Sequence, residues 1–489
     1  MFIEPGEAKK IFGGMKLKTL GALLLAGAAG LLATGCRTYQ QQNKVIADWR
    51  QGNLPKAVLE AGKLADANAQ KRDAVIWRLE HGAVLRAAGQ YADSNRAFDE
   101  AQAKIDDYAQ KAKIRLGQET GALLSNQATL AYEGRAYDGI LLNTYKALNY
   151  LALGEPDKAR PELIHAYQRQ QDAVEANKKR IAETRDAAQK NKDRAAVERT
   201  QSNTKLQSDL AAVSSNLDSV GGYADYVNPF TVYLDGLYFL ANAADASDRE
   251  RARKSLERAH AFAPGNNCVK QDLADAEALL EGKPLRPVTY VIFETGGAPE
   301  RDQIRIDIPT FWRELPYLGA AFPILKLQDN YVPSLTVSAS NLNATSTALL
   351  ASMDRVIGLD FKNELPLVIT KTLVSTTIKA VATHYAWEAT RNKQADGSLD
   401  NGGIAGALVI ISCVAWCAAN NIADERTWTT LPKEFQVARV PTPADRRIDL
   451  TAPNGLKTSV VINDGTVNVV YVKSVNLGTP LLVSQFKLK

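Results

Sequence analysis

Cysteine and histidine are scarce in this chain, which contains four of each among its 489 residues. Cys268 stands alone, and Cys413 and Cys417 lie in an apolar segment at a spacing that suits neither a disulfide within one helix nor a zinc site. The histidines are far apart in the sequence. These features exclude a disulfide framework and predict no metal ion and no other cofactor.

An excess of charge of one sign is also lacking, because 59 Lys and Arg face 54 Asp and Glu and the net charge is +5 at pH 7. Proteins that bind nucleic acid neutralise its phosphates with clusters of basic side chains, and this sequence has no such cluster. We therefore expect no nucleic-acid partner.

Catalytic motifs are missing as well. The sequence contains no G-x-S-x-G, no H-E-x-x-H, no G-x-G-x-x-G and no phosphate loop of the G-x-x-x-x-G-K-S type. A hydrolase that acts on the cell wall or on lipid is the least favoured alternative, because its nucleophile and base would have to be brought together by the fold. We expect a protein that is not an enzyme.

A secretory leader stands at the N-terminus. Residues 15–18 give it a basic start, and Leu20–Leu32 is an apolar run too short to span a bilayer comfortably. Small residues lead from it to Gly35 and Cys36, whose thiol can carry a thioether-linked lipid. The pattern resembles bacterial lipoprotein signals, so we expect cleavage between Gly35 and Cys36 and attachment to a membrane through lipid on Cys36. The alternative is an uncleaved anchor with an unrelated cysteine.

The signal peptide then comprises residues 1–35, or begins at Met15 if the start codon is assigned too early. Residues 36–44 form a short polar tether. Residue 37 is Arg rather than the Asp that resembles an inner-membrane retention signal. We therefore expect the protein on the outer membrane, facing the periplasm.

Residues 45–285 have a helical pattern in which pairs of helices recur. A glycine is followed by a small residue at the same offset in Gly52 and Ala57, Gly89 and Ser94, and Gly154 and Ala159. The glycine suits a tight turn between two helices, and the small residue lets the helices pack closely. The pattern resembles the tetratricopeptide repeat, with an unrelated all-α array as the alternative. Either array would offer a concave surface to a protein partner.

A polar insertion interrupts this array over residues 165–220. Its apolar positions recur every seven residues at first, and every three or four later. Such a narrow line of apolar side chains along a helix, or seam, predicts a coiled-coil hairpin of two antiparallel helices, with a single extended helix as the alternative. The hairpin is a candidate arm for binding a partner, and a solvated spacer is the other interpretation.

The period of the pattern changes from helical to alternating near residues 283–287, so we expect a separate domain over residues 286–489. Asp464-Gly465 lies between two alternating runs and predicts a hairpin with a two-residue turn. Helical pattern returns over residues 344–428, as an insertion among the strands. The predicted fold class is α+β, with an all-α N-terminal domain and a mixed β C-terminal domain.

Residues 401–423 form a segment without a single charged side chain. Its continuous apolar centre is shorter than the ~30 Å hydrocarbon layer of a membrane. We therefore favour a fully buried helix. The alternative is a hairpin over residues 366–423 that dips into the membrane.

Four short sequence segments of the mature chain are distinctive: Asn149–Gly154, Asp225–Phe230, Phe361–Pro366 and Arg426–Pro432. Together they resemble one bacterial family, the tetratricopeptide-type outer-membrane lipoproteins of proteobacteria. No catalytic residues are assigned in that family, so none is implied here. Its genes often lie beside those for an outer-membrane activator of peptidoglycan synthases, which implies an envelope partner and a link to cell-wall synthesis.

Arg426 and Trp428 precede a Leu-Pro pair that must end any helix. They are candidate contacts for a partner, and the alternative is that Trp428 packs the helical insertion onto the sheet. Taken together, these features predict a lipid-anchored envelope scaffold or adaptor that binds another envelope protein through its helical array. An export or membrane-remodelling component with a membrane-inserting hairpin at 366–423 is the alternative. Nothing in the sequence indicates an oligomeric state.

Overall fold

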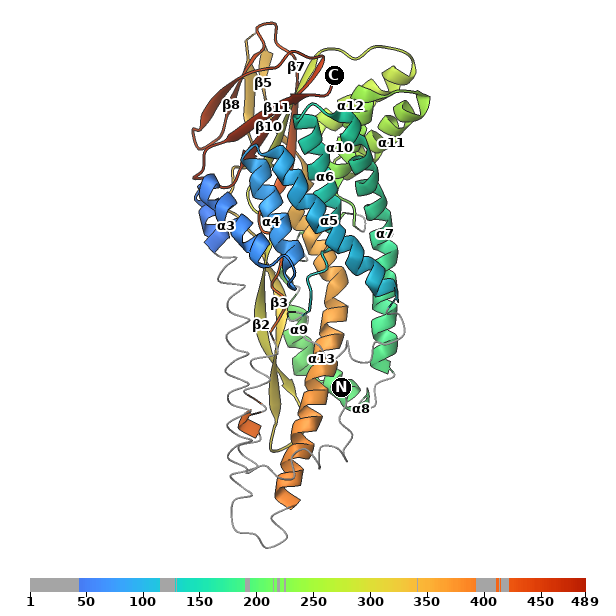
Figure 1. Cartoon of the computed structure of the whole chain (residues 1–489). Coiled ribbons are helices and arrows are strands. Elements are labelled where there is room, and N and C mark those ends of the chain that lie inside the picture. Colours follow the sequence, from blue (N-terminus) through green and yellow to red (C-terminus); the bar gives the residue numbers. More distant parts are fainter. Residues whose placement is uncertain are drawn as a thin grey trace.

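The computed structural model describes residues 44–114, 128, 130–189, 194–213, 215–217, 220–223, 226–340, 342–392, 410–412, 414 and 422–489. Within them, helices make up the N-terminal region and strands dominate the C-terminal region (Figure 1), so the predicted mixture of helix and sheet is confirmed. The predictions for the signal peptide, for Gly35 and Cys36, and for most of residues 401–423 lie outside the described residues.

The helices of the N-terminal region follow one another along the chain and pack as neighbours. They are α3 (Leu54–Ala67), α4 (Ala74–Ala87), α5 (Tyr91–Ile114), α6 (Ala136–Ala152), α7 (Pro156–Gln189), α10 (Pro229–Asn242), α11 (Ala246–Phe262) and α12 (Asn267–Leu280). Gly52, Gly89 and Gly154 precede α3, α5 and α7 with φ angles of 73°, 75° and 76°. Glycine adopts this left-handed backbone without the cost that other residues meet, so these glycines make the expected turns.

Two sheets pack face to face in the C-terminal region. The central sheet has the order β11 (Leu482–Lys487), β10 (Val467–Ser474), β1 (Val288–Thr295), β7 (Glu434–Pro441) and β6 (Ala348–Ser352). The outer sheet has the order β5 (Leu342–Ser346), β4 (Thr336–Ala339), β8 (Arg447–Thr451) and β9 (Lys457–Val461). Within the central sheet only β1 and β10 run parallel, and the other neighbours are antiparallel.

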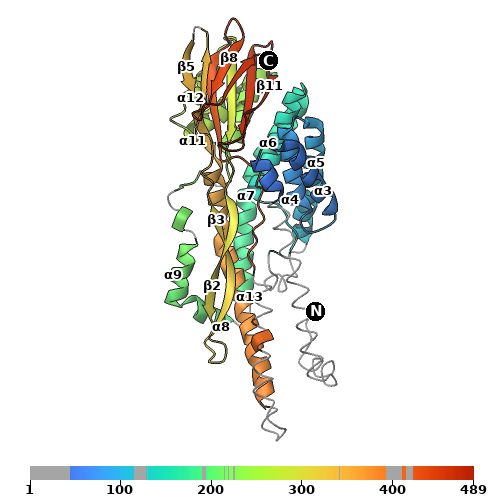
Figure 2. The same cartoon turned by 90° about the vertical axis from the view of Figure 1, so that its left-hand side faces the viewer.

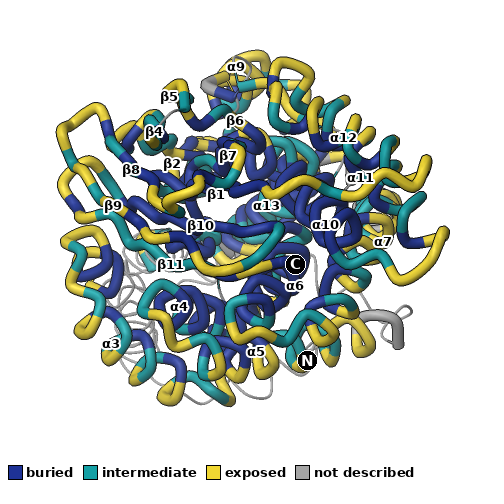
Figure 3. Tube along the Cα trace, turned by 90° about the horizontal axis from the view of Figure 1, so that it is seen from above, coloured by how far each residue is buried: buried dark blue, intermediate teal, exposed yellow. Residues whose placement is uncertain are grey.

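The central sheet lies between the helices and the outer sheet, as the view from above shows (Figure 3). Along β1, Tyr290 and Ile292 pack against the helices, whereas Val291 and Phe293 pack against the outer sheet. Both faces of the strand are therefore buried, which its run of β-branched and aromatic residues reflects. Because one hydrophobic cluster contains residues from Val45 to Leu488, the helical and β regions share a core.

The hairpin predicted at Asp464-Gly465 is wrong. The two strands exist, but β9 pairs with β8 in the outer sheet, and β10 pairs with β1 and β11 in the central sheet. The chain crosses from one sheet to the other between them. The backbone N–H of Ile462 donates to Arg446 O at 2.7 Å, and that of Thr466 donates to Lys489 O at 2.8 Å. These bonds to other segments replace those of a hairpin.

The coiled-coil hairpin predicted over residues 165–220 is also wrong in its packing. Its first half continues α7, but its second half forms the short helices α8 (Arg194–Gln201) and α9 (Thr204–Ala212). These pack against α13 (Met353–Asn392) and β2 (Glu300–Pro309) rather than along α7. Leu206 and Val213 are buried in the main hydrophobic core there, so the apolar positions of the second half are covered without the predicted partner helix.

An elongated stalk projects from the compact head formed by α3–α6, α10–α12 and the two packed sheets (Figures 1 and 2). The stalk consists of α13, the antiparallel ribbon of β2 and β3 (Tyr317–Lys326), α8, α9 and the far end of α7. At 1.5 Å per residue, the 40 residues of α13 span about 60 Å. The helical insertion predicted from residue 344 begins later than expected, because Ala348–Ser352 forms the edge strand β6.

Candidate functional site

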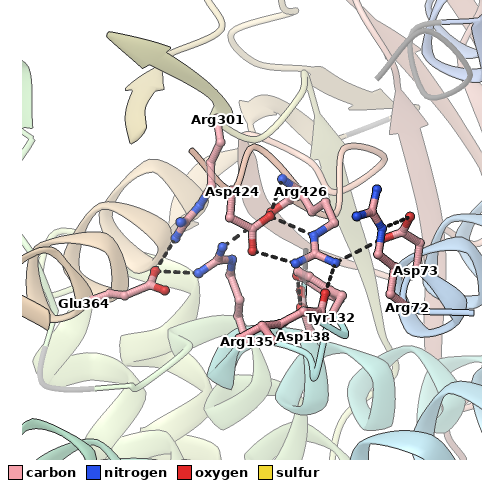
Figure 4. A network of polar contacts seen from close by, with 10 residues as sticks. Arg72, Asp73, Tyr132, Arg135, Asp138, Arg301, Glu364, Asp424 and Arg426 are labelled. Carbon is pink, nitrogen blue, oxygen red and sulfur yellow. Dashed lines mark hydrogen bonds and ion pairs between the residues drawn. The ribbon is translucent and has the colours of Figure 1, made fainter. Parts of the chain in front are cut away.

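Arg426 lies at the centre of a buried polar network between the head and the stalk (Figure 4). Its Nε and Nη2 donate to the two carboxylate oxygens of Asp424 at 2.7 and 3.0 Å. Its Nη1 donates to Asp73 at the start of α4 and to Leu130 O, both at 2.9 Å. The guanidinium also lies 5.4 Å from the ring centre of Tyr132. One side chain thus joins three segments that are distant in the sequence.

Trp428 has no exposed surface, and Arg426 is only 7% exposed. The indole meets the rings of Phe98 and Tyr145 edge-on, with 5.8 Å between the ring centres in each pair. Its Nε1–H donates to Thr430 Oγ1 at 3.0 Å. The interpretation of Arg426 and Trp428 as partner contacts is therefore wrong in this structure, because their surfaces are covered by the chain itself. Trp428 instead packs its segment onto the helices.

A second set of ion pairs in this network links the helical array to two elements of the stalk, β2 and α13. Arg135, at the start of α6, and Arg301, on β2, both donate to Oε2 of Glu364 on α13. The Arg301 side chain is almost entirely buried and lies 5.1 Å from the ring centre of Phe361. Buried arginine and carboxylate groups that share hydrogen bonds in this way hold their elements in one relative position.

Two buried carboxyl groups next to these ion pairs have raised pKa values. Burial raises the pKa of Glu80 to about 7, although its oxygens accept hydrogen bonds from the backbone of Thr429 and Thr430 at 2.6 and 3.2 Å. Burial likewise raises the pKa of Asp138 to about 6, against the hydrogen bond that it accepts from Tyr132. Both groups therefore titrate near neutral pH rather than at pH 4.

A separate polar cluster joins the helical array to the central sheet. Arg86 on α4 donates to Asn149 Oδ1 on α6 at 2.7 Å and lies 4.7 Å from the ring centre of Tyr471 on β10. The hydroxyl of Tyr471 donates to Glu294 on β1, and Lys473 donates to the other oxygen of that carboxylate at 2.6 Å. The lysine charge holds the pKa of Glu294 below its usual value despite burial.

These clusters hold structural elements together through hydrogen bonds and ion pairs, which is a structural role. The carboxylates named above accept hydrogen bonds from arginine, lysine, hydroxyl or backbone donors of the protein, and the arginines lie against aromatic rings. In the part of the chain that the structure describes, no group of His, Cys, Asp and Glu side chains could hold a metal ion.

The three most exposed aromatic side chains among the described residues lie on the stalk. Phe311, which follows β2, is 42% exposed, Tyr317 on β3 is 56% exposed, and Tyr385 near the end of α13 is 64% exposed. Among the described residues, the helix Met353–Glu388 is long and apolar enough to cross a membrane, and 50% of its most apolar window is buried. These exposed side chains make the stalk a candidate contact surface.

Each of the four sequence segments that carry the family resemblance contributes a polar side chain to a contact inside the protein. Asn149, Glu364 and Arg426 belong to the clusters described above, and the side chain of Asn228 caps α10. Glu80 was missed by sequence reasoning, although a lone acid within the apolar α4 is a signal of a buried charge. Comparison of the chain with protein-family models, with curated proteins and with solved structures finds no match.

Proposed function

We propose that this protein is a lipid-anchored adaptor of the bacterial cell envelope, which works by binding rather than by catalysis. Cys36 would carry the lipid, and the outer membrane, on its periplasmic side, would be the site of attachment. The stalk would make the functional contact with a second envelope protein. The family resemblance supports a partner linked to cell-wall synthesis.

The exposed aromatic side chains of the stalk are the observation that carries this proposal. The inner face of the helical array, where a partner was first expected, is filled by the protein's own sheet and by α13. On α10, for example, every residue from Pro229 to Ala241 is buried. Tyr317 and Tyr385 lie instead on the projecting stalk and have most of their side-chain surface free.

The helix pairs themselves are consistent with tetratricopeptide-type packing. The small residues Ala57, Ser94 and Ala159 are completely buried, and Ser94 Oγ donates to Gly82 O of the neighbouring helix at 2.7 Å. Such close contact is what small residues at these positions permit. In this proposal the helical array holds the stalk in a fixed position.

Site-specific photo-crosslinking in intact cells tests the proposal. A photoreactive residue at Tyr317 or Tyr385 should give one discrete crosslinked product that contains a second envelope protein. The matched control is Leu59 on α3, which is 56% exposed but lies on the head. Equal capture from Leu59 and from the stalk positions, or no product from the stalk, would refute the proposal.

An export or membrane-remodelling component is the second candidate, because the apolar helix Met353–Glu388 satisfies the length and composition of a membrane span. In this case the hairpin over residues 366–423 would enter the bilayer. Flotation of the purified Cys36→Ser chain with lipid vesicles tests the candidate. Co-flotation that survives high salt supports insertion, and recovery of the protein at the bottom of the gradient contradicts it.

A further inference from the structure

A partly enclosed cavity of about 310 Å³ lies in the stalk between α8, the loop after β2 and α13. Its lining includes Arg199, Phe311, Trp312, Thr376 and Thr377. Its volume is at the lower end of the range for small-molecule sites. Filled with water alone, it would hold about ten molecules, for which the largely apolar wall provides few hydrogen bonds.

Arg199 supplies a positive charge at this cavity. Its guanidinium lies 4.2 Å from the ring centre of Phe311, and no salt bridge joins it to a carboxylate among the described residues. By contrast, Arg301 of the same stalk is paired with Glu364. The guanidinium is therefore available to an anion that enters the cavity.

Phe311 adopts an unusual backbone conformation at the cavity wall. Its φ angle is 67°, a left-handed value that costs free energy in any residue with a side chain and is uncommon in an aromatic one. Even so, the ring is 42% exposed rather than buried in the core. A strained residue that keeps an apolar ring at a cavity is typical of a binding site.

Two threonine side chains on the α13 wall have hydroxyls without a partner. Thr376 is 1% exposed and Thr377 is 5% exposed, and Oγ1 of each is buried without a hydrogen bond. A buried hydroxyl left without a partner is destabilising. Rotation about χ1 would let either hydroxyl donate to an oxygen atom of a ligand in the cavity.

We propose that this cavity binds an acyl chain with an anionic head group. Arg199 pairs with the head group, Thr376 and Thr377 donate to its oxygen atoms, and the chain lies against Phe311 and Trp312. A free fatty acid and a phospholipid of the membrane share this chemistry. The site goes beyond the proposed function, because it requires no partner protein.

Titration calorimetry with dodecanoate and dodecan-1-ol tests this site on the mature chain that carries Cys36→Ser, which brings no acyl chains of its own. Dodecanoate should bind at least about tenfold more tightly than the alcohol, because a charge-assisted hydrogen bond contributes at least that much. Arg199→Gln should abolish the difference. Arg305→Gln, on the exposed face of β2, should preserve it.

Phe311→Gly separates binding from folding. Glycine accepts the φ angle of 67°, so the melting temperature should not fall, whereas dodecanoate should bind several-fold more weakly without the ring. Vesicles of phosphatidylglycerol distinguish the two lipid sources. If the membrane supplies the ligand, the vesicles bind the parent chain more tightly than the Arg199→Gln chain, and if free acids supply it, only dodecanoate does. Failure of both ligands to bind, or equal binding by the Arg199→Gln chain, overturns the proposal.

Discussion

Arg135 and Arg301 share a single carboxylate, because both donate to Oε2 of Glu364. The first arginine stands at the start of α6 in the helical array, the second lies on the β2–β3 ribbon, and the glutamate is on α13. Neither guanidinium lies on the surface, so water cannot replace the carboxylate. The position of the stalk relative to the head therefore depends on this contact.

Glu364→Ala is expected to destabilise the protein by about 3 to 5 kcal/mol, because it leaves two buried arginines without their carboxylate. Urea unfolding followed by circular dichroism measures the loss. Glu281→Ala is the matched control, since Glu281 pairs with Lys283 on the surface and both side chains are more than half exposed. The control should leave the unfolding midpoint unchanged. Equal midpoints for the two variants would contradict a structural role for Glu364.

The free energy of unfolding should fall as the pH rises from about 5 to 7, in part because of Glu80. The pKa of this group is about 7 in the folded protein and 4.5 in its ordinary state. The folded state thus binds more protons than the unfolded state between these values, so raising the pH disfavours folding over this window and has no further effect above it.

Glu80→Gln, which resembles the protonated acid, should remove this part of the pH dependence. We expect the difference in stability between pH 5 and pH 7.5 to shrink by about 1 to 3 kcal/mol relative to the parent chain. Thermal unfolding at the two pH values provides the comparison. Parallel pH profiles for parent and variant would show that Glu80 is ionised throughout the window.

Gly89→Ala should cost about 1 to 2 kcal/mol through backbone strain alone, because its φ angle is 75° and no atom would contact an added Cβ. Gly89→Asn should cost less, since asparagine tolerates the left-handed region. Gly265→Ala is the matched control, because its Cβ also meets open space and its φ angle lies outside that region. Chemical denaturation measures all three, and a loss in the control as large as that in Gly89→Ala would refute the argument.

The local structure of the N-terminal half could be predicted from the sequence because its signals are local. Gly52 and Gly89 make turns whose φ angles only glycine adopts readily, and the small residues after them set the spacing of adjacent helices. The change from helix to strand between Leu280 and Val288 also occurs where the pattern places it. Each of these features depends on residues within one or two turns of chain.

The hairpin and the coiled coil were predicted wrongly because their strand and helix partners depend on contacts between distant segments. Asp464-Gly465 has the composition of a hairpin turn, but Thr466 bonds to Lys489, and the chain passes to another sheet. Similarly, the helix that carries Leu206 packs against β2 rather than along α7, because apolar patterning shows which face is buried but not which surface covers it.

The candidate site was only partly accessible to sequence reasoning for the same reason. Arg426 and Trp428 were recognised as unusual residues, yet their burial follows from contacts with Asp73 and Phe98, more than 300 residues earlier in the chain. Glu364 lay within one of the sequence segments that carry the family resemblance. Its two arginines could not be assigned to it, because no local spacing relates residues so far apart.

Fractionation of cells that express the Cys36→Ser chain, with the signal peptide retained, tests the central claim most directly. If lipid on Cys36 is the anchor and the stalk binds a partner outside the bilayer, the variant should appear in the soluble periplasmic fraction, while the parent chain requires detergent. A variant that still requires detergent after washing at high salt and high pH would contradict the adaptor account and would point to insertion of the segment over residues 366–423.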